Sequence, residues 1–111
     1  MSYTVLLLDE AEQDLLQIHA YVKHRFSASL ALEIYQSLRD SILMLEQNPS
    51  LGPVIESLAA LGMTNFRHLV VLKKNRVVYE VDETGLLIYV HLICHERQDY
   101  ESVLRQRILR Q

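Results

Sequence analysis

Five side chains in the second half of the sequence are of the types that cut RNA without a metal ion: Arg67, Arg76, His95, Arg97 and Tyr100. A histidine or a tyrosine can transfer a proton as a general acid or base. Arginines around a phosphate stabilise the negative charge that develops in the transition state. If these five side chains converge on one phosphate, the sequence predicts a metal-free ribonuclease site.

A structural role explains the same arginines equally well. Arg97 and Arg67 could pair with Asp99 or Glu80 and fix the end of a sheet. In that case the charged side chains would stabilise the fold instead of acting on a phosphate.

Metal and cofactor chemistry find little support in the sequence. The run from His95 to Asp99 partly matches the zinc-protease pattern HExxH, but its fifth residue is aspartate and it starts at the end of a predicted strand. His91 and His95 would stand about 13 Å apart on such a strand, too far to share an ion. The glycines form no phosphate-binding loop, and Cys94 is interpreted as a small buried side chain. We therefore expect neither a metal nor a cofactor.

The length and composition predict one folded domain over residues 1–111. Half of the residues are apolar and 23% are charged, as in globular proteins, and 111 residues are too few for two independent cores. The apolar run near the N-terminus soon meets Asp9, so we expect neither a signal peptide nor a membrane span. A lone cysteine requires no oxidising compartment, and the cytoplasm is the expected location.

The charge of the chain is unevenly distributed. The formal net charge of -3 argues against binding to nucleic acid or membrane through bulk positive charge. Residues 1–63 contain three basic and eight acidic residues, whereas residues 64–111 contain eight basic and six acidic residues. The second half alone is therefore positive, which leaves room for a local basic site.

The first half predicts a strand and two helices. Residues 3–8 are β-branched, aromatic or aliphatic and predict the strand. Asp9 and Glu12 resemble a capping box that would begin the first helix, and Ser27 would cap the second. Apolar residues at helical spacing predict one buried stripe on each helix: Ala11, Leu15, Ile18, Val22 and Phe26, then Ala31, Ile34, Leu38, Ile42 and Leu45. The short break between the helices predicts an antiparallel hairpin that ends near Pro49.

The second half predicts a three-stranded meander. Its strands cover residues 66–72, 76–81 and 86–94, after a less regular connection over residues 54–63. The last strand is apolar on both faces, which predicts a central position in the sheet. Strict alternation places its residues on two faces: Leu86, Ile88, Val90 and Leu92 on one, and Leu87, Tyr89 and Ile93 on the other.

A final helix from Asp99 completes the order β-α-α-β-β-β-α, which predicts an α+β fold. The helical hairpin would pack on one face of a small, mainly antiparallel twisted sheet. With one helical layer, the second face of the sheet would lack a cover, so we expect a partner protein to bury it.

The meander also determines where the basic residues lie. We expect the start of its first strand and the end of its third strand to share one end of the sheet, so that Arg67 approaches His95 and Arg97. The Lys73-Lys74 hairpin would then lie at the opposite end of the sheet.

Several motifs, in their order and spacing, resemble the RelE/ParE superfamily of toxins from type II toxin–antitoxin modules, and most of all its ParE branch. The motifs include Ala11-Glu12-Gln13-Asp14-Leu15, Leu45-Glu46-Gln47-Asn48-Pro49-Ser50-Leu51-Gly52, Arg76-Val77-Val78-Tyr79-Glu80-Val81-Asp82 and His95-Glu96-Arg97-Gln98-Asp99-Tyr100. The resemblance covers nearly the whole chain. It implies a small α+β toxin bound by a cognate antitoxin, whose extended or helical segment lies over the sheet and the helical hairpin.

The resemblance implies two alternative activities. ParE-like toxins stabilise the cleaved complex of DNA gyrase with DNA and are not enzymes, and the residues that would bind this target are Arg67, His95, Arg97, Asp99 and Tyr100. RelE-like toxins cut messenger RNA on the ribosome, and the residues that could occupy comparable catalytic places are Arg67, Arg76, Arg97 and Tyr100, with His95 nearby. The mostly aliphatic sheet and the negative net charge favour the gyrase inhibitor. An inactive homologue, retained for a hetero-oligomer with the antitoxin and for operon repression, is the third hypothesis.

Overall fold

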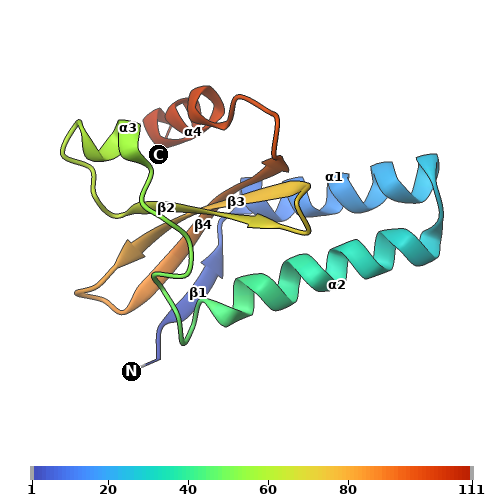
Figure 1. Ribbon diagram of the computed structural model, residues 1–111, viewed down its shortest axis with the longest axis horizontal. Coiled ribbons are helices and arrows are strands. Elements are labelled where there is room, and N and C mark those ends of the chain that lie inside the picture. The colour runs from blue at the N-terminus through green and yellow to red at the C-terminus, as the bar shows by residue number, and fades with distance from the viewer. Residues whose placement is uncertain (1, 111) are drawn as a thin grey trace.

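The structure is a computed structural model that describes residues 2–110. Figure 1 shows its elements in chain order: β1 (Thr4–Leu7), α1 (Asp9–Arg25), α2 (Ala28–Met44), α3 (Glu56–Ala59), β2 (Phe66–Val71), β3 (Asn75–Asp82), β4 (Leu87–His95) and α4 (Tyr100–Leu109). The predicted order of strands and long helices is confirmed. The short helix α3 occupies the irregular connection before the meander.

The four strands form one sheet in the order β1-β4-β3-β2. β2, β3 and β4 are antiparallel neighbours, as the hairpin signals predict, and β1 pairs in parallel with residues 87–90 of β4. β4 therefore has a strand on each side and occupies the central position that its sequence predicts. The α+β fold with a mainly antiparallel sheet is confirmed.

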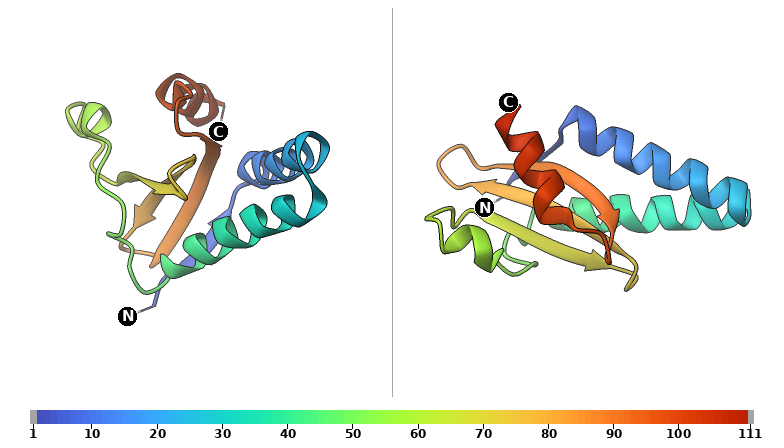
Figure 2. Two further views of the ribbon diagram at one scale, coloured as in Figure 1. Left: turned by 45° about the vertical axis from the view of Figure 1, so that its right-hand side comes forward. Right: turned by 90° about the horizontal axis from the view of Figure 1, so that it is seen from above.

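The hairpin of α1 and α2 covers one face of the sheet (Figure 2). The predicted apolar stripes of both helices pack with Val77, Tyr79 and Val81 of β3 into the larger core. Phe26 is the exception, because it follows the last residue of α1 and remains 67% exposed.

The two helices of the hairpin begin differently. Ser27 caps α2 as predicted, since its Oγ accepts a hydrogen bond from the backbone N–H of Leu30 at 3.0 Å. The capping box predicted at Asp9 is wrong, because Leu8 is the N-cap residue of α1 and offers no side-chain acceptor. Three acidic residues instead occupy the first turn of α1, where negative charge is favourable beside the helix dipole.

The buried side chain of Tyr79 fixes the turn that follows the helical hairpin. Its hydroxyl donates to the carbonyl oxygen of Pro49 and accepts from the N–H of Gly52, both at 2.9 Å. A Cβ atom at Gly52 would stand 2.1 Å from the carbonyl oxygen of His68 in β2. The carbonyl oxygen of Gly52 accepts a hydrogen bond from Arg67 at 2.8 Å. Glycine is the residue that allows so close an approach of the turn to β2.

A β-bulge at His91 changes which residues of β4 face each side of the sheet. The residues of β3 that flank the bulge pair with Val90 and Leu92, so His91 has no partner in the register. The side chains before the bulge alternate as predicted. Beyond it, Leu92 packs on the side away from the helical hairpin and Ile93 packs against the hairpin, the reverse of the prediction.

The second face of the sheet has its own cover, contrary to the prediction of an open face. α3 and α4 lie over it, on the side opposite the helical hairpin (Figure 2). Leu104 of α4 packs with Ile55, Leu58 and the sheet into a second cluster of buried residues. The final helix is amphipathic, and burial of its apolar side requires this packing.

The two longest helices contain 17 residues each. No helix within residues 2–110 combines the length and the apolar character needed to cross a membrane.

Candidate functional site

Strand direction separates Arg67 from His95, so the predicted meeting of these residues is wrong. β2 and β4 run in the same direction, because each is antiparallel to β3. Arg67 is opposite Tyr79, and Tyr79 is opposite Val90, whereas His95 is opposite the first residue of β3. The backbone from Val90 to His95 spans about 17 Å at the usual rise of a strand. The two side chains therefore lie at different ends of the sheet.

The same strand direction brings the Lys73-Lys74 hairpin to the end of β4. The N–H of Glu96 donates to the carbonyl oxygen of Lys74 at 2.7 Å. Lys73, Lys74, His95 and Arg97 are all exposed at this end of the sheet. These four residues are referred to below as the basic strip.

A compact cluster of His68, Arg76 and Tyr100 lies next to the basic strip. Nη1 of Arg76 lies 2.8 Å from Nδ1 of His68, and Nη2 donates to the carbonyl oxygen of Glu96 at 3.1 Å. The guanidinium carbon of Arg76 lies 4.5 Å from the ring centroid of Tyr100, and the rings of Tyr100 and His68 stack with centroids 5.7 Å apart. Because a guanidinium can only donate, Nδ1 of His68 accepts, and the neutral ring carries its proton on Nε2.

Burial determines the protonation of the cluster. It lowers the pKa of His68 below the ordinary value of 6.5, and the charge of Arg76 lowers it further. Burial raises the pKa of the Tyr100 hydroxyl, with a further contribution from Glu101. The pKa of Cys94, raised by burial to about 11, makes this residue a neutral thiol and not an activated nucleophile. At neutral pH the cluster therefore contains one cation, Arg76, beside two neutral rings.

The lowered pKa of His68 predicts a loss of stability in mild acid. The unfolded chain binds a proton near pH 6.5, whereas folded His68 resists that proton. The contribution of His68 to the free energy of unfolding is therefore fully present above pH 6.5. It is lost as the pH drops from there toward the folded-state pKa. Urea unfolding between pH 7.5 and 5.5 should give a shallower pH slope for His68→Gln than for the wild type. His24→Gln, at the exposed end of α1, controls for the loss of a histidine. An unchanged pH slope in His68→Gln would show that His68 does not cause the loss of stability.

The ion pairs predicted for Arg67 and Arg97 are not present among residues 2–110. Arg67 instead hydrogen-bonds to the carbonyl of Gly52. The side chain of Arg97 is 87% exposed and makes one contact with a carboxylate, at 4.0 Å from Oε1 of Glu96. Arg97 is therefore free to contact another molecule.

His95 and Asp99 organise the backbone between β4 and α4. Nδ1 of His95 accepts a hydrogen bond from the N–H of Arg97 at 3.1 Å. Asp99 is the N-cap residue of α4, and its carboxylate accepts from the N–H of Ser102 at 3.4 Å and from the hydroxyl of Ser102 at 2.7 Å. The hydrogen bonds from Ser102 lower the pKa of Asp99. Of the predicted site residues, Asp99 thus has a clear structural role.

His68 is a member of the cluster that sequence reasoning missed. The pattern contained a signal for it, because in the β2–β3 hairpin His68 and Arg76 are diagonal neighbours on one face of the sheet. Pairing the two predicted strands around the Lys73-Lys74 turn would have placed them together.

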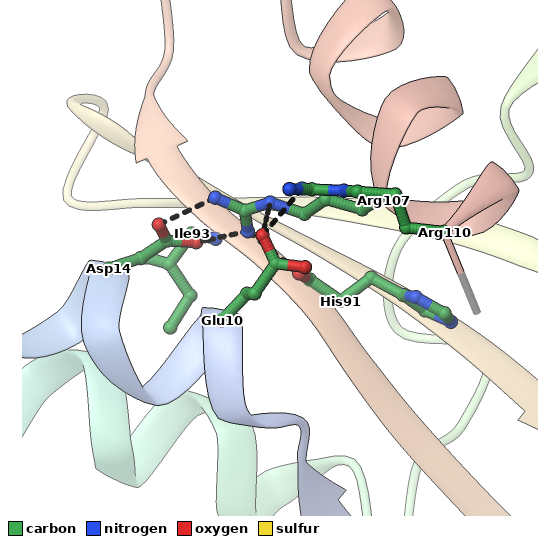
Figure 3. Close-up of polar contacts among 6 residues, drawn as sticks. All are labelled: Glu10, Asp14, His91, Ile93, Arg107 and Arg110. Carbon is green, nitrogen blue, oxygen red and sulfur yellow. Dashed lines mark hydrogen bonds and ion pairs between the residues drawn. The ribbon is translucent and has the colours of Figure 1, made fainter.

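An ion pair holds α4 against α1 and β4 (Figure 3). Nη1 and Nη2 of Arg107 donate to the two carboxylate oxygens of Asp14 at 2.6 and 2.8 Å, and Nη1 also donates to the carbonyl oxygen of His91 at 2.9 Å. The carboxylate of Asp14 accepts from the N–H of Ile93 at 3.0 Å. The pairing with β1 ends at Val90, so these side chains satisfy backbone groups of β4 beyond the end of β1. The hydrogen bonds to Asp14 raise the pKa of Arg107.

The described part of the chain contains no group of three His, Cys, Asp or Glu side chains arranged to hold a metal ion.

The architecture defines a class of protein. A helical hairpin covers one face of a four-stranded sheet, and a C-terminal helix and a His-Arg-Tyr cluster lie on the other. Solved structures with a similar fold include a ParDE toxin–antitoxin system and the toxin RelE. The sequence matches the family model described as ParE toxin of type II toxin-antitoxin system, parDE, over residues 5–100. The chain therefore belongs to the ParE toxin family, as the resemblance in the sequence predicts. Among curated proteins, none matches the sequence.

Three solved structures illustrate the similarity of fold. The chromosomal ParDE system from P. aeruginosa has a TM-score of 0.69 and 18% identity, with 85% of this chain and 96% of that chain covered. A double mutant of the E. coli toxin RelE in the free state has a TM-score of 0.62 and 14% identity, with 99% and 97% covered. The RelBE2 toxin–antitoxin complex from Mycobacterium tuberculosis has a TM-score of 0.57 and 14% identity, with 86% and 100% covered.

Proposed function

We propose that this toxin inhibits DNA gyrase by stabilising the cleaved complex of gyrase with DNA, without cutting a substrate itself. A cognate antitoxin binds and neutralises it. Membership of the ParE family supports the ParE-like alternative, for which the resemblance in the sequence implies gyrase as the target. The P. aeruginosa ParDE system and the M. tuberculosis RelBE2 complex, which share this fold, support the antitoxin as a partner.

The observation that carries the proposal is the separation of the groups that a ribonuclease would need to bring together. Arg67 lies at the far end of the sheet. Arg76 is occupied by hydrogen bonds within the protein. The raised pKa of Tyr100 makes its hydroxyl a poorer proton donor at neutral pH than a free tyrosine. Within the cluster itself Arg76 is the one cation, and its guanidinium already has hydrogen-bond partners in the protein, which favours an inhibitor over a catalyst.

A cleavage assay with purified gyrase tests the proposal. Toxin added to gyrase, ATP and supercoiled plasmid should produce linear DNA that carries covalently attached gyrase after denaturation with detergent. The same reaction with an equimolar amount of the cognate antitoxin should produce none. Unchanged plasmid at saturating toxin would reject gyrase as the target.

The cluster itself favours a second candidate, a ribosome-dependent endoribonuclease. His68 and Tyr100 are proton-transfer groups that contact the same cation, Arg76. Primer extension on a translated messenger RNA would then show toxin-dependent cuts. Arg76→Ala and Tyr100→Phe should reduce the rate of cutting by about 100-fold or more. Intact messenger RNA in the presence of wild-type toxin would reject this candidate.

A further inference from the structure

The basic strip is placed at one end of the molecule by the register of the sheet. Asn75, directly after the two lysines, is opposite His95, so the β2–β3 turn and the end of β4 are adjacent. In Figure 1 both point to the same side as the loop that joins α1 and α2. The last turn of α1 adds three more basic residues on that side: Lys23, His24 and Arg25.

The positive charge of the strip is not neutralised within the described part of the chain. Lys73 and Lys74 make no ion pair among residues 2–110, and Arg97 has only its 4.0 Å contact with Glu96. Asp14, which lines the same groove, and Glu10 pair with Arg107 and Arg110 and not with the strip. The strip is therefore a positive region on a chain whose formal net charge is -3.

The turn that presents the strip is strained. Leu72 and Lys73 have φ angles of 56° and 57°, in the left-handed region that favours Asn and Gly at the two central positions of a type I′ turn. The N–H of Lys74 donates to the carbonyl oxygen of Val71 at 3.1 Å and closes the turn. Leu72 is 53% exposed, so packing does not compensate for the strain. Strain retained at an exposed position indicates a function for the side chains displayed there.

The strip remains open to a large partner. It lines one side of a groove of about 1020 Å³, and the opposite side is formed by residues of the helical hairpin such as Tyr21 and Phe26. The hairpin therefore does not cover the lysines, and their ammonium groups can reach a molecule that approaches along the long axis of the protein.

We propose that the basic strip contacts the phosphate backbone of the DNA held in the gyrase cleavage complex. This inference rests on the proposed function and adds a direct contact between toxin and DNA. Two exposed lysines, and an exposed arginine whose contact with a carboxylate is as long as 4.0 Å, are the kinds of group that bind phosphates irrespective of the DNA sequence. Residues 1–63 contain eight acidic and three basic residues, so electrostatics favours an approach to DNA through the basic strip, where the basic last turn of α1 also lies.

Charge reversal in the gyrase cleavage assay tests the contact. Lys74→Glu should raise the toxin concentration that gives half-maximal linear DNA by about tenfold, and this loss should be largest at low salt. Arg105→Glu makes the same change in formal charge at an exposed position of α4 and should stay within about twofold of the wild type. Equal potency of Lys74→Glu and wild-type toxin would overturn the inference while leaving the proposed function intact.

A second measurement distinguishes DNA from the protein surface of gyrase. Tagged Lys74→Glu toxin should retain wild-type binding to gyrase in the absence of DNA. Loss of binding to DNA-free gyrase would overturn the inference, because the strip would then contact protein. Absence of linear DNA with wild-type toxin would instead reject the proposed function, and the inference with it.

A second variant relieves the backbone strain at Leu72 and Lys73 and tests the inference independently. Leu72→Asn/Lys73→Gly places the preferred residues in the turn and should raise the melting temperature by several degrees. The same variant removes one base from the strip, so it should also require more toxin for half-maximal linear DNA. A more stable protein with weaker activity cannot be explained by unfolding. A more stable protein with full activity would overturn the inference that the strained turn is retained for the function of its side chains.

Discussion

Arg107→Ala is expected to lower the free energy of unfolding by about 3 kcal/mol. The side chains of Arg107 and Asp14 are each only 12% exposed, and two hydrogen bonds of 2.6 and 2.8 Å join them. Truncation of Arg107 leaves the carboxylate of Asp14 largely buried without its cation and removes the donor to the carbonyl of His91. Urea denaturation followed by circular dichroism at pH 7 measures the change.

A neighbouring ion pair supplies the matched control. Arg110 donates to Glu10 at 2.7 Å, but the two side chains are 63% and 46% exposed. Solvent screens this pair, so Arg110→Ala should cost no more than about 1 kcal/mol. In a double-mutant cycle, Asp14→Ala and Arg107→Ala together should cost less than the sum of the single changes. Equal losses for Arg107→Ala and Arg110→Ala would show that burial does not strengthen the inner pair.

Gly52→Ala is expected to cost about 3 kcal/mol, at the upper end of overpacking effects. The added Cβ atom would stand 2.1 Å from the carbonyl oxygen of His68 and 2.7 Å from its carbonyl carbon. Both are backbone atoms of β2, so the turn must move away from the strand. That movement strains the hydrogen bonds of Gly52 with Tyr79 and Arg67. The shift of the urea midpoint measures the cost.

Gly85→Ala separates this effect from the loss of a glycine in general. A Cβ atom at Gly85 would first meet Oδ2 of Asp82 at 2.8 Å, the end of a side chain that can rotate away. Gly85→Ala should therefore cost less than about 1 kcal/mol. Tyr79→Phe tests the hydrogen bonds alone, because it leaves the N–H of Gly52 and the carbonyl of Pro49 without the hydroxyl, at about 1–3 kcal/mol. A stable Gly52→Ala variant would show that the turn is not held against β2.

The helices and the meander strands could be predicted because their signals are local. The stripes from Ala11 to Leu45 follow the helical period, and Ser27 is a favourable cap in any helix that begins there. The side chains of β4 could be predicted only as far as Val90, because a bulge depends on how two strands pair and not on the sequence of one strand.

The candidate site was harder to predict because it depends on contacts between distant segments. The prediction placed His95 and Arg97 beside Arg67, but β2 and β4 run in the same direction, so the end of β4 lies beside the Lys73-Lys74 turn. A single histidine in one strand has no distinctive spacing, so His68 can be recognised as a site residue only after β2 and β3 are paired and it lies beside Arg76. The bidentate contact of Arg107 with Asp14 has no local signal, since it joins the first helix to the last.

The contact between Arg107 and Asp14 affects how the chain folds during its synthesis on the ribosome. Asp14 and Arg107 are 93 residues apart in the sequence, and β1 finds its partner only in β4. A growing chain leaves the ribosome with its N-terminus first, and contacts between residues far apart in the sequence form late and slowly. A translation product that stops before β4 lacks the strand that joins β1 to the rest of the sheet, and one that stops before Arg107 cannot form the ion pair that holds α4. Activity is therefore expected to arise only after nearly the whole chain has left the ribosome, which gives a co-produced antitoxin time to be present when the toxin folds.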